Sequence, residues 1–472
     1  MQVTVIGAGY VGLTTSACLA ALGHRVVCAD INRERIAGLQ RGAVPFREEG
    51  LEELMKSAVS RKTLRFSAEP AQAVGRSEVV FIAVGTPKGS GGEADVSYVR
   101  DAARALAPAI APATVVALKS TVKVGTARMI REAIAEQRGA LDFKIASNPE
   151  FLREGSAVAD FMYPDRIVIG ADDKQAADRL AKLYQPILSR GVPLVRTGTT
   201  NAELIKYAAN ALLALRIGFI NDVADLCENI DGDISAIARG IGLDHRIGAS
   251  FLAPGPGYGG SCFPKDTEAF AAIGRKHNAP QLLVETLIKS NQARKRWIAE
   301  RIAGEVKGLN APQIAVLGMA FKANTDDVRE SPALEIIPYL QARGARVRAF
   351  DPWARGNAEA RLPQVIWAKD PYEATQGADL LVVLTEWKIF RDLDMARIFR
   401  EMRIPSVFDC RNLFDGAAMA KCGFRYVSLG RAPVSPVLPP AITHPSMSIR
   451  KRGRSKMLTP SRMAEDEHPV PG

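Results

Sequence analysis

A glycine-rich stretch at residues 255–266 carries the residue types needed for covalent chemistry. It reads Gly-Pro-Gly-Tyr-Gly-Gly-Ser-Cys-Phe-Pro-Lys-Asp, so Cys262 follows four glycines and is followed within one turn by Lys265 and Asp266. Glycines let another molecule approach the backbone closely, and a nearby cation lowers the pKa of a thiol and favours the thiolate nucleophile. We therefore expect a loop that presents Cys262 to a substrate, although most lone cysteines are inert small hydrophobes.

Residues 2–30 predict a dinucleotide-binding unit. A β-branched run at 2–7 leads into Gly7-Ala-Gly9-Tyr-Val-Gly12, a helical segment that ends near Gly23, and a second strand at 25–29 that stops at Asp30. The glycines permit a tight turn and close approach to a pyrophosphate, whose charge the helix N-terminus favours. Asp30 lies where an acid accepts the ribose hydroxyls and disfavours a 2′-phosphate, so the complete unit indicates NAD rather than NADP.

Threonines follow two later strands of the same predicted sheet. The strand at 79–84 ends in Gly85-Thr86-Pro87, and the strand at 114–118 ends in Lys119-Ser120-Thr121. In doubly wound sheets, ligands lie beyond the carboxyl ends of the strands. We therefore expect Thr86 and Thr121 to face the cofactor or the substrate.

Two acidic residues follow a further strand at 143–146. Asn148 is a good N-cap and Pro149 a good first helical residue, so a helix is predicted to start there. Glu150 and Glu154 would then lie four residues apart on one helical face. Paired acids on a helix usually face solvent, but this position beyond a strand favours a role in chemistry.

A long helix is predicted between about residues 201 and 230. Lys206 and Asn210 are four residues apart and therefore share a face, on the polar side of the first turns. Further helical segments at 233–241 and 266–304 would separate two sheets, and such an apolar helical spine favours a homodimer or a higher homo-oligomer. The apolar positions of the long helix are Leu204, Ala208, Ala211, Leu212, Leu215 and Phe219.

A second α/β unit begins with a strand at 313–318. Its turn, Gly318-Met-Ala-Phe-Lys322, lacks the second and third glycines, so we expect this unit to bind something other than a dinucleotide. Lys322, Asp326, Asp327 and Arg329 would lie on the rim of that site. The unit continues with a helix at 332–343 and strands at 346–350, 380–384 and 407–411.

The length of 472 residues predicts several domains. The order of the predicted strands and helices indicates an α/β protein with two Rossmann-like, doubly wound parallel-sheet domains joined by a long central helical segment. The boundaries that we predict are 1–198, 199–305, 306–430 and a basic, proline-rich, disordered tail at 431–472.

Composition narrows the classes of partner. The net charge of +11 is a modest excess that suits anionic small molecules and does not require nucleic acid. No apolar run reaches the length of a membrane span, and no basic leader precedes the first strand, so we expect a cytoplasmic protein. The six cysteines and five histidines show no metal-ligand spacing, which predicts free thiols and no metal.

Taken together, these stretches resemble the UDP-glucose 6-dehydrogenase branch of the nucleotide-sugar 6-dehydrogenase family. The resemblance covers about residues 1–430 and spans all three units. The matching stretches are Gly7–Gly12, Asp30 with Arg35, Gly85-Thr-Pro87, Ser120-Thr-Val122, Asn148–Glu154, Ile205–Asn210, the 255–266 loop, and Phe321-Lys322 with Arg329-Glu-Ser-Pro332.

The resemblance implies a four-electron oxidation of a sugar C6 alcohol, that of UDP-glucose, to a carboxylate with two NAD per turnover. It implies Cys262 as the nucleophile; the residues that it places around the reacting carbon are Lys206, Asn210, Asp266, Glu150 and Thr121. The cofactor contacts that it implies are Gly7, Gly9, Tyr10, Val11, Gly12, Asp30, Arg35, Thr86, Thr121, Glu154, Lys265 and Arg329.

The resemblance also implies a set of contacts to the nucleotide sugar. These are Glu150, Phe151, Leu152, Arg153, Glu154, Lys206, Asn210, Arg246, Phe251, Leu252, Ala253, Pro254, Gly255, Gly259, Lys322 and Arg411. One departure from the family pattern is Cys410, where related sequences usually have glycine. This departure bears on the substrate contact that the resemblance implies for the next residue, Arg411.

Two alternatives remain open at this point. GDP-mannose or another UDP-hexose is a possible substrate, because only the base pocket separates uridine from guanosine, although the intact Pro264-Lys265-Asp266 argues against the N-acetylmannosamine branch. The alternative from another class is a catalytically silent NAD-binding scaffold. The presence of Cys262, Lys206 and Glu150 on three separate stretches speaks against it.

Overall fold

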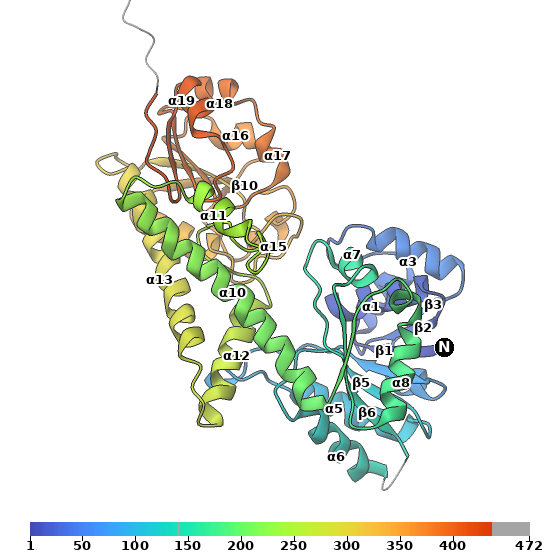
Figure 1. Cartoon of the computed structure of the whole chain (residues 1–472). Coiled ribbons are helices and arrows are strands. Elements are labelled where there is room, and N and C mark those ends of the chain that lie inside the picture. Colours follow the sequence, from blue (N-terminus) through green and yellow to red (C-terminus); the bar gives the residue numbers. More distant parts are fainter. Residues whose placement is uncertain (139–141, 437–472) are drawn as a thin grey trace, which may run out of the picture. The chain divides into compact units, whose positions relative to one another are not determined.

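Two β-sheets, the helices that pack on them and the helices that connect them make up the part of the chain that the structure describes (Figure 1). This computed structural model describes residues 1–138 and 142–436. Of the predicted tail at 431–472, residues 437–472 lie outside the described residues. The predicted fold class, two Rossmann-like sheets joined by a long central helix, is confirmed.

The first sheet has eight strands in the order β3-β2-β1-β4-β5-β6-β7-β8. Its strands pair in parallel except at β6 and β7, so the last two strands run against the other six. The order reverses between β1 and β4, where doubly wound sheets bind ligands. The bounds are β1 Gln2–Ile6, β2 Arg25–Ala29, β3 Leu64–Ser67, β4 Val79–Ile82, β5 Val115–Leu118, β6 Lys144–Ser147, β7 Ile167–Gly170 and β8 Leu194–Thr197.

Helices cover this sheet on both faces, and two apolar clusters fill the space between. The strands β4 and β5, Val-Val-Phe-Ile and Val-Val-Ala-Leu, are buried at every position, as expected for parallel strands covered on both faces. The helices are α1 Tyr10–Ala21, α2 Arg33–Gln40, α3 Leu51–Ser60, α4 Pro70–Val74, α5 Ser97–Leu106, α6 Thr126–Arg138, α7 Ala157–Met162, α8 Lys174–Leu183 and α9 Gln185–Leu188.

The second sheet is parallel, with the order β11-β10-β9-β12-β13-β14. A separate apolar cluster forms its core. Its strands are β9 Gln313–Leu317, β10 Arg346–Phe350, β11 Ile366–Trp367, β12 Leu380–Val383, β13 Ser406–Asp409 and β14 Arg425–Ser428. Its helices are α14 Ala333–Gln341, α15 Arg355–Glu359, α16 Pro371–Thr375, α17 Lys388–Arg391, α18 Met395–Glu401 and α19 Gly416–Lys421.

The chain between the sheets is helical: α10 Thr199–Asn229, α11 Ile234–Gly242, α12 Phe263–Lys276 and α13 Leu282–Glu305. The predicted segment 266–304 is two helices, because Asn278 adopts a positive φ of 54° and Pro280 follows it without an N–H to donate. None of the helices in the described ranges combines the length and apolarity that a bilayer crossing requires. The cytoplasmic location stays a prediction.

The faces of α10 differ from the prediction. Lys206 and Asn210 share one face, but this polar side of the helix is buried, together with Glu203 and Tyr207. This side of α10 packs against α12 and the first sheet. The sequence pattern failed here because the buried face of α10 carries the polar groups of a site, and polar groups with partners can be buried.

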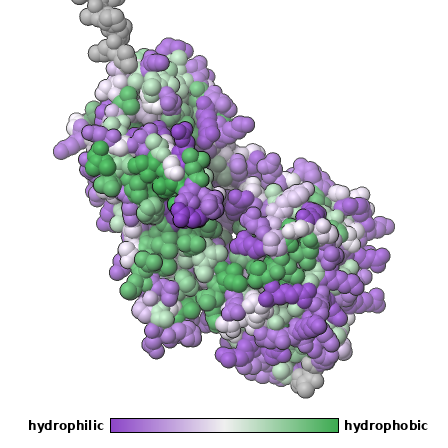
Figure 2. Space-filling view, viewed as in Figure 1, coloured by the Kyte–Doolittle hydropathy of each residue, from purple (hydrophilic) through white to green (hydrophobic). Residues whose placement is uncertain are grey.

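The apolar positions of α10 include several exposed residues. Leu212, Phe219 and Leu226 are each more than half exposed. Leu212, Phe219 and Leu226 recur every seven residues and therefore share one face of the helix. Figure 2 shows hydrophobic residues gathered along this helix. The apolar positions predicted for α10 thus belong partly to an open surface.

The glycines of the first turn, Gly7, Gly9 and Gly12, serve different purposes. Gly7 has φ of +101°, which disfavours a side chain. A Cβ at Gly12 would lie 1.8 Å from the Gly7 carbonyl oxygen, whereas a Cβ at Gly9 would meet nothing within 4 Å. Gly12 is therefore required by helix-to-strand packing, and Gly9 leaves open space beside the N-terminus of α1, as a pyrophosphate needs.

This difference predicts opposite defects for two matched variants. Gly12→Ala should lower the free energy of unfolding by about 1–3 kcal/mol, the usual cost of overpacking. Gly9→Ala should leave the melting temperature unchanged and weaken NAD binding, because its methyl group enters the open space. Thermal unfolding and NAD titration of both variants measure this, and a stable Gly12→Ala protein would contradict the packing account.

Candidate active site

Two cavities meet at Cys262. One, of about 580 Å³, is lined by Lys206 and Asn210. The other, of about 780 Å³, opens toward the glycine turn and Thr121. Cys262, Glu150 and Leu152 line both cavities, so the thiol lies where the two join.

The second cavity collects most of the predicted cofactor residues. Those that line it are Gly9, Tyr10, Val11, Thr86, Thr121, Glu154, Lys265 and Arg329. Gly7 and Gly12 shape the turn beneath it. Asp30 accepts hydrogen bonds from the Ala8 N–H at 2.7 Å and the Arg35 guanidinium at 3.1 Å, so the predicted acid lies beside the turn. The open turn, its helix N-terminus and the adjacent acid fit a dinucleotide.

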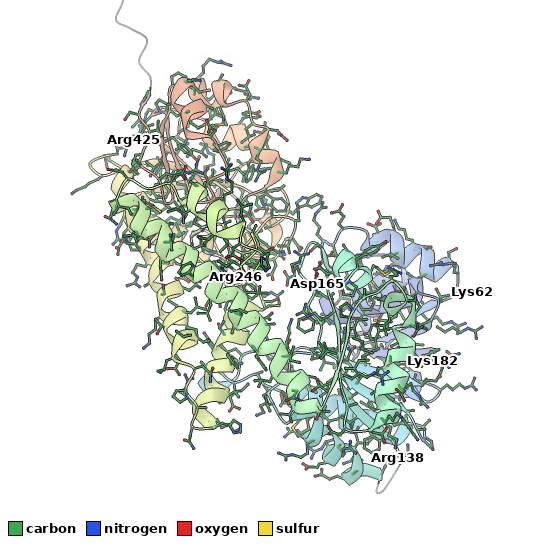
Figure 3. All side chains as sticks on the ribbon, in the orientation of Figure 1. Lys62, Arg138, Asp165, Lys182, Arg246 and Arg425 are labelled. Atoms are coloured by element: carbon green, nitrogen blue, oxygen red, sulfur yellow. The ribbon has the colours of Figure 1, made fainter. Side chains whose placement is uncertain are left out.

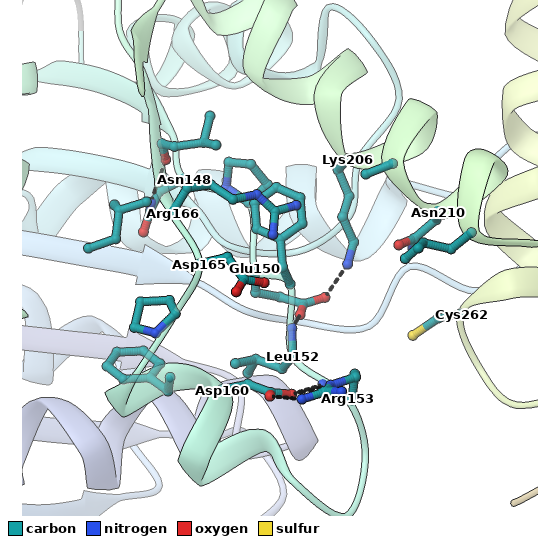
Figure 4. A pocket seen from close by; sticks show the side chains of 18 of the residues that line it. Asn148, Glu150, Leu152, Arg153, Asp160, Asp165, Arg166, Lys206, Asn210 and Cys262 are labelled. Carbon is teal, nitrogen blue, oxygen red and sulfur yellow. Dashed lines mark hydrogen bonds and ion pairs between the residues drawn. The ribbon is translucent and has the colours of Figure 1, made fainter. Parts of the chain in front are cut away.

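A buried ion pair lies in the first cavity. The Lys206 ammonium is 2.9 Å from a Glu150 oxygen, and the side chains are only 4% and 6% exposed. Figure 4 shows Lys206 pointing from α10 toward Glu150, with the Cys262 sulfur facing the same space. Burial acts to lower the pKa of Lys206, but the charges of Glu150, Cys262 and Asp266 raise it above its ordinary value. Lys206 is therefore a cation beside the thiol.

Two further polar contacts fix the side-chain amide of Asn210, which also lies on α10. Asn210 Nδ2 donates to Asp266 Oδ2 at 2.6 Å, and the Lys265 ammonium lies 2.5 Å from Asp266 Oδ1. Asp266 is 1% exposed and lies in the first turn of α12, directly after Cys262. The cysteine loop and α10 are thus fixed to each other by polar side chains.

The segment 148–156 is not the predicted helix, which makes the expected pairing of Glu150 and Glu154 on one helical face wrong. No helix begins within residues 148–156, and the next helix, α7, starts at Ala157. The Asn148 side chain is not free to cap a helix, because its amide donates to the Val168 carbonyl at 2.8 Å and its oxygen accepts from Tyr184 at 2.6 Å. The same Asn148 oxygen also accepts a hydrogen bond from the Lys119 ammonium at 3.1 Å.

The extended segment sends its two acids to different places. Glu150 faces Lys206, whereas Glu154 accepts from Ser261 Oγ at 2.8 Å and from the Arg329 guanidinium at 3.3 Å. Burial raises the pKa of Glu154 to about 7, with a further increase from Asp327 that Arg329 opposes. Glu154 therefore joins the first sheet, the cysteine loop and the chain after β9.

The environment of Cys262 differs from the expected one. Burial raises the pKa of its thiol to about 11; Lys206 acts to lower it, but Glu150 and Asp266 act in the opposite direction. The predicted activating cation, Lys265, is instead paired with Asp266. The expectation of a lowered thiol pKa is thus wrong, because burial and two carboxylates outweigh one ammonium.

Polar side chains that carried no sequence signal hold the cysteine loop. Asn221 accepts from the Gly255 N–H at 2.9 Å, and Arg294 Nε donates to the Gly255 carbonyl at 2.6 Å. Asn291 accepts from the Tyr258 N–H at 2.8 Å. These residues lie on long helices and form no local motif, so only the folded chain reveals them.

The predicted substrate residues divide into three groups. Those that line the first cavity are Glu150, Phe151, Leu152, Arg153, Lys206, Asn210 and Phe251. Glu154 lines the second cavity instead. Neither cavity at Cys262 is lined by the other eight, Leu252, Ala253, Pro254, Gly255, Gly259, Arg246, Lys322 and Arg411. Arg246, labelled in Figure 3, is exposed and pairs with Asp244.

Arg411 lies beside the cysteine loop despite the neighbouring Cys410. Its guanidinium donates to the Leu384 carbonyl at 2.8 Å and to the Phe321 carbonyl at 3.0 Å, and a Cβ at Gly255 would lie 3.0 Å from it. Cys410 is fully buried. The thiol in place of glycine is therefore accommodated without displacing Arg411 from the loop.

The six cysteines are free thiols. Among residues 1–138 and 142–436, no three His, Cys, Asp or Glu side chains come close enough to hold a metal ion.

Three models of the UDP-glucose/GDP-mannose dehydrogenase family match successive parts of the chain. The NAD binding domain matches residues 1–188, the central domain residues 200–293, and the UDP binding domain residues 315–416. The chain is also similar to a UDP-glucose 6-dehydrogenase of Rhizobium meliloti (strain 1021), with 48% identity over 435 residues that cover 91% of this chain and 100% of the relative.

Solved structures agree with these matches. A UDP-glucose dehydrogenase from the hyperthermophilic archaeon Pyrobaculum islandicum has a TM-score of 0.85 at 38% identity, covering 91% of this chain and 98% of its own. A UDP-D-ManNAc dehydrogenase from Pyrococcus horikoshii has a TM-score of 0.80 at 25% identity, covering 91% and 99%.

The raised pKa of Cys262 predicts slow alkylation at neutral pH. Because the thiolate is the nucleophile and the pKa is about 11, the rate of iodoacetamide alkylation should rise about tenfold per pH unit from pH 7 to pH 10. Peptide mass spectrometry separates Cys262 from the exposed Cys422, which serves as an internal reference. A plateau already at pH 7 would show that the thiol is ionised in the resting protein.

Proposed function

This chain belongs to the UDP-glucose/GDP-mannose dehydrogenase family of NAD-dependent oxidoreductases, and we propose that it oxidises UDP-glucose at C6 to UDP-glucuronate. The reaction is a four-electron oxidation that uses two NAD and passes through a thiohemiacetal and a thioester on Cys262. The single observation that carries this proposal is the position of Cys262 at the junction of the two cavities, beside Lys206 and Glu150.

Each segment has its own task in this proposal. Residues 1–198 bind NAD, 199–305 supply the cysteine loop and the dimer surface, and 306–430 bind the nucleotide. The cavity lined by Gly9, Thr121 and Cys262 would hold NAD, which would supply the hydride acceptor for each oxidation. The sugar carbon must then lie on the other side of Cys262, between Lys206 and Asn210.

Lys206 and Asn210 stabilise charge on the C6 oxygen. A fixed ammonium and an amide donor in a buried site favour negative charge that develops on an oxygen. After the first oxidation, Cys262 adds to the aldehyde: the Sγ–C6 bond forms and the thiol proton moves to the aldehyde oxygen. This route suits a thiol that is protonated at rest. The resulting thiohemiacetal can lose its hydroxyl proton and a second hydride and become a thioester.

Glu150 acts in hydrolysis of the thioester. A carboxylate at this position can take a proton from water that attacks C6, and the C6–Sγ bond then breaks. Asp266 fixes Asn210 through the 2.6 Å hydrogen bond and thereby positions the second amide hydrogen of Asn210 as a donor. Thr121 lines the cofactor cavity near the same junction.

The choice of UDP-glucose rests on similarity. The relative from Rhizobium meliloti and the structure from Pyrobaculum islandicum are both named for UDP-glucose, and the second sheet matches a UDP binding domain. GDP-mannose or another UDP-hexose is the alternative with the same chemistry. A silent NAD-binding scaffold is disfavoured by the buried Lys206–Glu150 pair beside a thiol.

Cys262→Ser and Cys262→Ala should lose turnover by several orders of magnitude, on the order of the loss when other covalent nucleophiles are removed. Supplied with the C6 aldehyde of UDP-glucose and NAD, both variants should remain almost inactive, because only the second oxidation needs the sulfur. NADH absorbance measures both reactions. Cys422→Ser, which removes an exposed thiol, is the control and should keep full turnover. Normal aldehyde oxidation by Cys262→Ala would leave Cys262 with a packing role only.

We also propose that the exposed apolar face of α10 pairs with the same face of a second copy. An isologous interface needs one self-complementary surface, and the repeated Leu212, Phe219 and Leu226 offer it. Burying such residues favours association by the hydrophobic effect.

A charge on this face should dissociate the dimer. Phe219→Glu and Leu226→Glu place a carboxylate on the proposed interface, so their mass in solution by light scattering should be half that of the wild type. Val59→Glu changes an exposed apolar residue on α3 and should remain dimeric. A monomeric wild-type protein at micromolar concentration would contradict the proposal.

A further inference from the structure

A second lysine is buried near the ion pair and has no role in the mechanism so far. Lys119 directly follows β5 and is 5% exposed. Its ammonium donates to Asn148 Oδ1 at 3.1 Å and to the Tyr184 hydroxyl at 3.4 Å. Within residues 1–138 and 142–436 it makes no ion pair, and it lines the same cavity as Glu150 and Lys206.

Packing alone does not explain a cation at this place. Burying an ammonium without a paired carboxylate is costly, and two hydrogen bonds leave one of its three donors without a protein partner. The rings of Phe81, Phe161 and Tyr184 lie 5.8–6.0 Å from the ammonium and offset only part of that cost. An apolar side chain of similar length would fill the space without this penalty.

Lys119 holds the start of the segment that carries Glu150. Its partner Asn148 is also fixed by the Val168 carbonyl, and the Asn148 N–H donates to the Leu118 carbonyl at 2.8 Å. Glu150 follows two residues later, with no helix to support it. The direction of Glu150 toward Lys206 therefore depends on how firmly Asn148 is held.

The charge of Lys119 also acts on this site. The ionisable groups around it are Tyr184, which it contacts, Cys18 near Tyr184, Glu150 and Lys206, whose charges act on it, and Asp160 and Arg166, which line the same cavity. Burial lowers the pKa of Lys119 to about 8; Glu150 opposes this effect and Lys206 adds to it. Lys119 is thus mainly an ammonium at pH 7 and loses its charge as the pH rises through about 8.

We propose that Lys119 is a positioning residue for thioester hydrolysis, which holds the Asn148–Glu150 segment and supplies a second positive charge near the Glu150 carboxylate. The inference rests on the proposed function. In the step concerned, the water oxygen bonds to C6, the C6–Sγ bond breaks, and Cys262 leaves as a thiolate. One water proton moves to Glu150 and from there to the Cys262 sulfur, which restores the thiol, and the other passes to solvent as the product carboxylate forms.

The variant Lys119→Met keeps the length of the side chain and removes its charge and its donors. Hydrolysis should slow on the order of 10²-fold, the usual effect of misplacing a catalytic group. In rapid-quench experiments with UDP-glucose and NAD, a burst of NADH should precede slow turnover. The sugar-nucleotide thioester on the Cys262 peptide should accumulate above the wild-type level, while the KM for NAD stays unchanged.

Two further variants separate the causes. Tyr184→Phe removes one contact to Asn148 and leaves the charge of Lys119, so its burst should be much smaller. Lys182→Met, on the surface of α8 (Figure 3), is the control and should behave like the wild type. Where Lys119→Met does not fold, Lys119→Gln, which is neutral but still a donor, is tested in the same way.

The dependence on pH gives a readout that a merely structural role would not move. The ratio of wild-type to Lys119→Met hydrolysis rates should be largest below pH 8 and should fall above it, since the wild-type ammonium is lost there. A ratio independent of pH, or equal slowing of every step with a lower melting temperature, would overturn the inference. Absence of any Cys262 adduct in the wild type would instead overturn the proposed covalent mechanism.

Discussion

The buried ion pair between Lys206 and Glu150 is the constraint on which the rest of the site depends. Two charges that are almost inaccessible to water are tolerable only where each keeps its partner, and removal of either leaves an uncompensated charge. One comes from the long helix α10 and the other from an extended segment after β6. The two segments must therefore keep a fixed position relative to each other, and much of the polar network near Cys262 fixes that position.

The same requirement explains how the second sheet is tied to the site. Glu154 contacts Ser261 and Arg329, the Gly260 N–H donates to the Arg329 carbonyl at 2.8 Å, and a Cβ at Gly259 would lie 2.3 Å from the Glu330 carbonyl oxygen. The cysteine loop is thus packed between the first sheet and the chain after β9. Glycines in this loop serve close packing as well as access for a ligand.

Local features of the sequence predicted the fold well. The first strand, the glycine turn and Asp30 lie within thirty residues, so their geometry follows from nearby residues. The prediction failed where residues far away in the chain determine the conformation of a segment or the pKa of a side chain. Asn148 has the local signature of a helix cap, but Lys119 and Tyr184 occupy its side chain. The pKa of Cys262 depends on burial and on Lys206 and Glu150, which are more than fifty residues away in the chain.

The stoichiometry of the reaction tests the central claim most directly. Purified protein is given a limiting amount of UDP-glucose with excess NAD, with GDP-mannose and other UDP-hexoses run in parallel, and NADH and sugar products are counted. A covalent four-electron oxidation at Cys262 predicts two NADH per UDP-glucose, UDP-glucuronate as the product and no free aldehyde. One NADH per sugar with release of the aldehyde, or no NADH with any nucleotide sugar, would contradict the account.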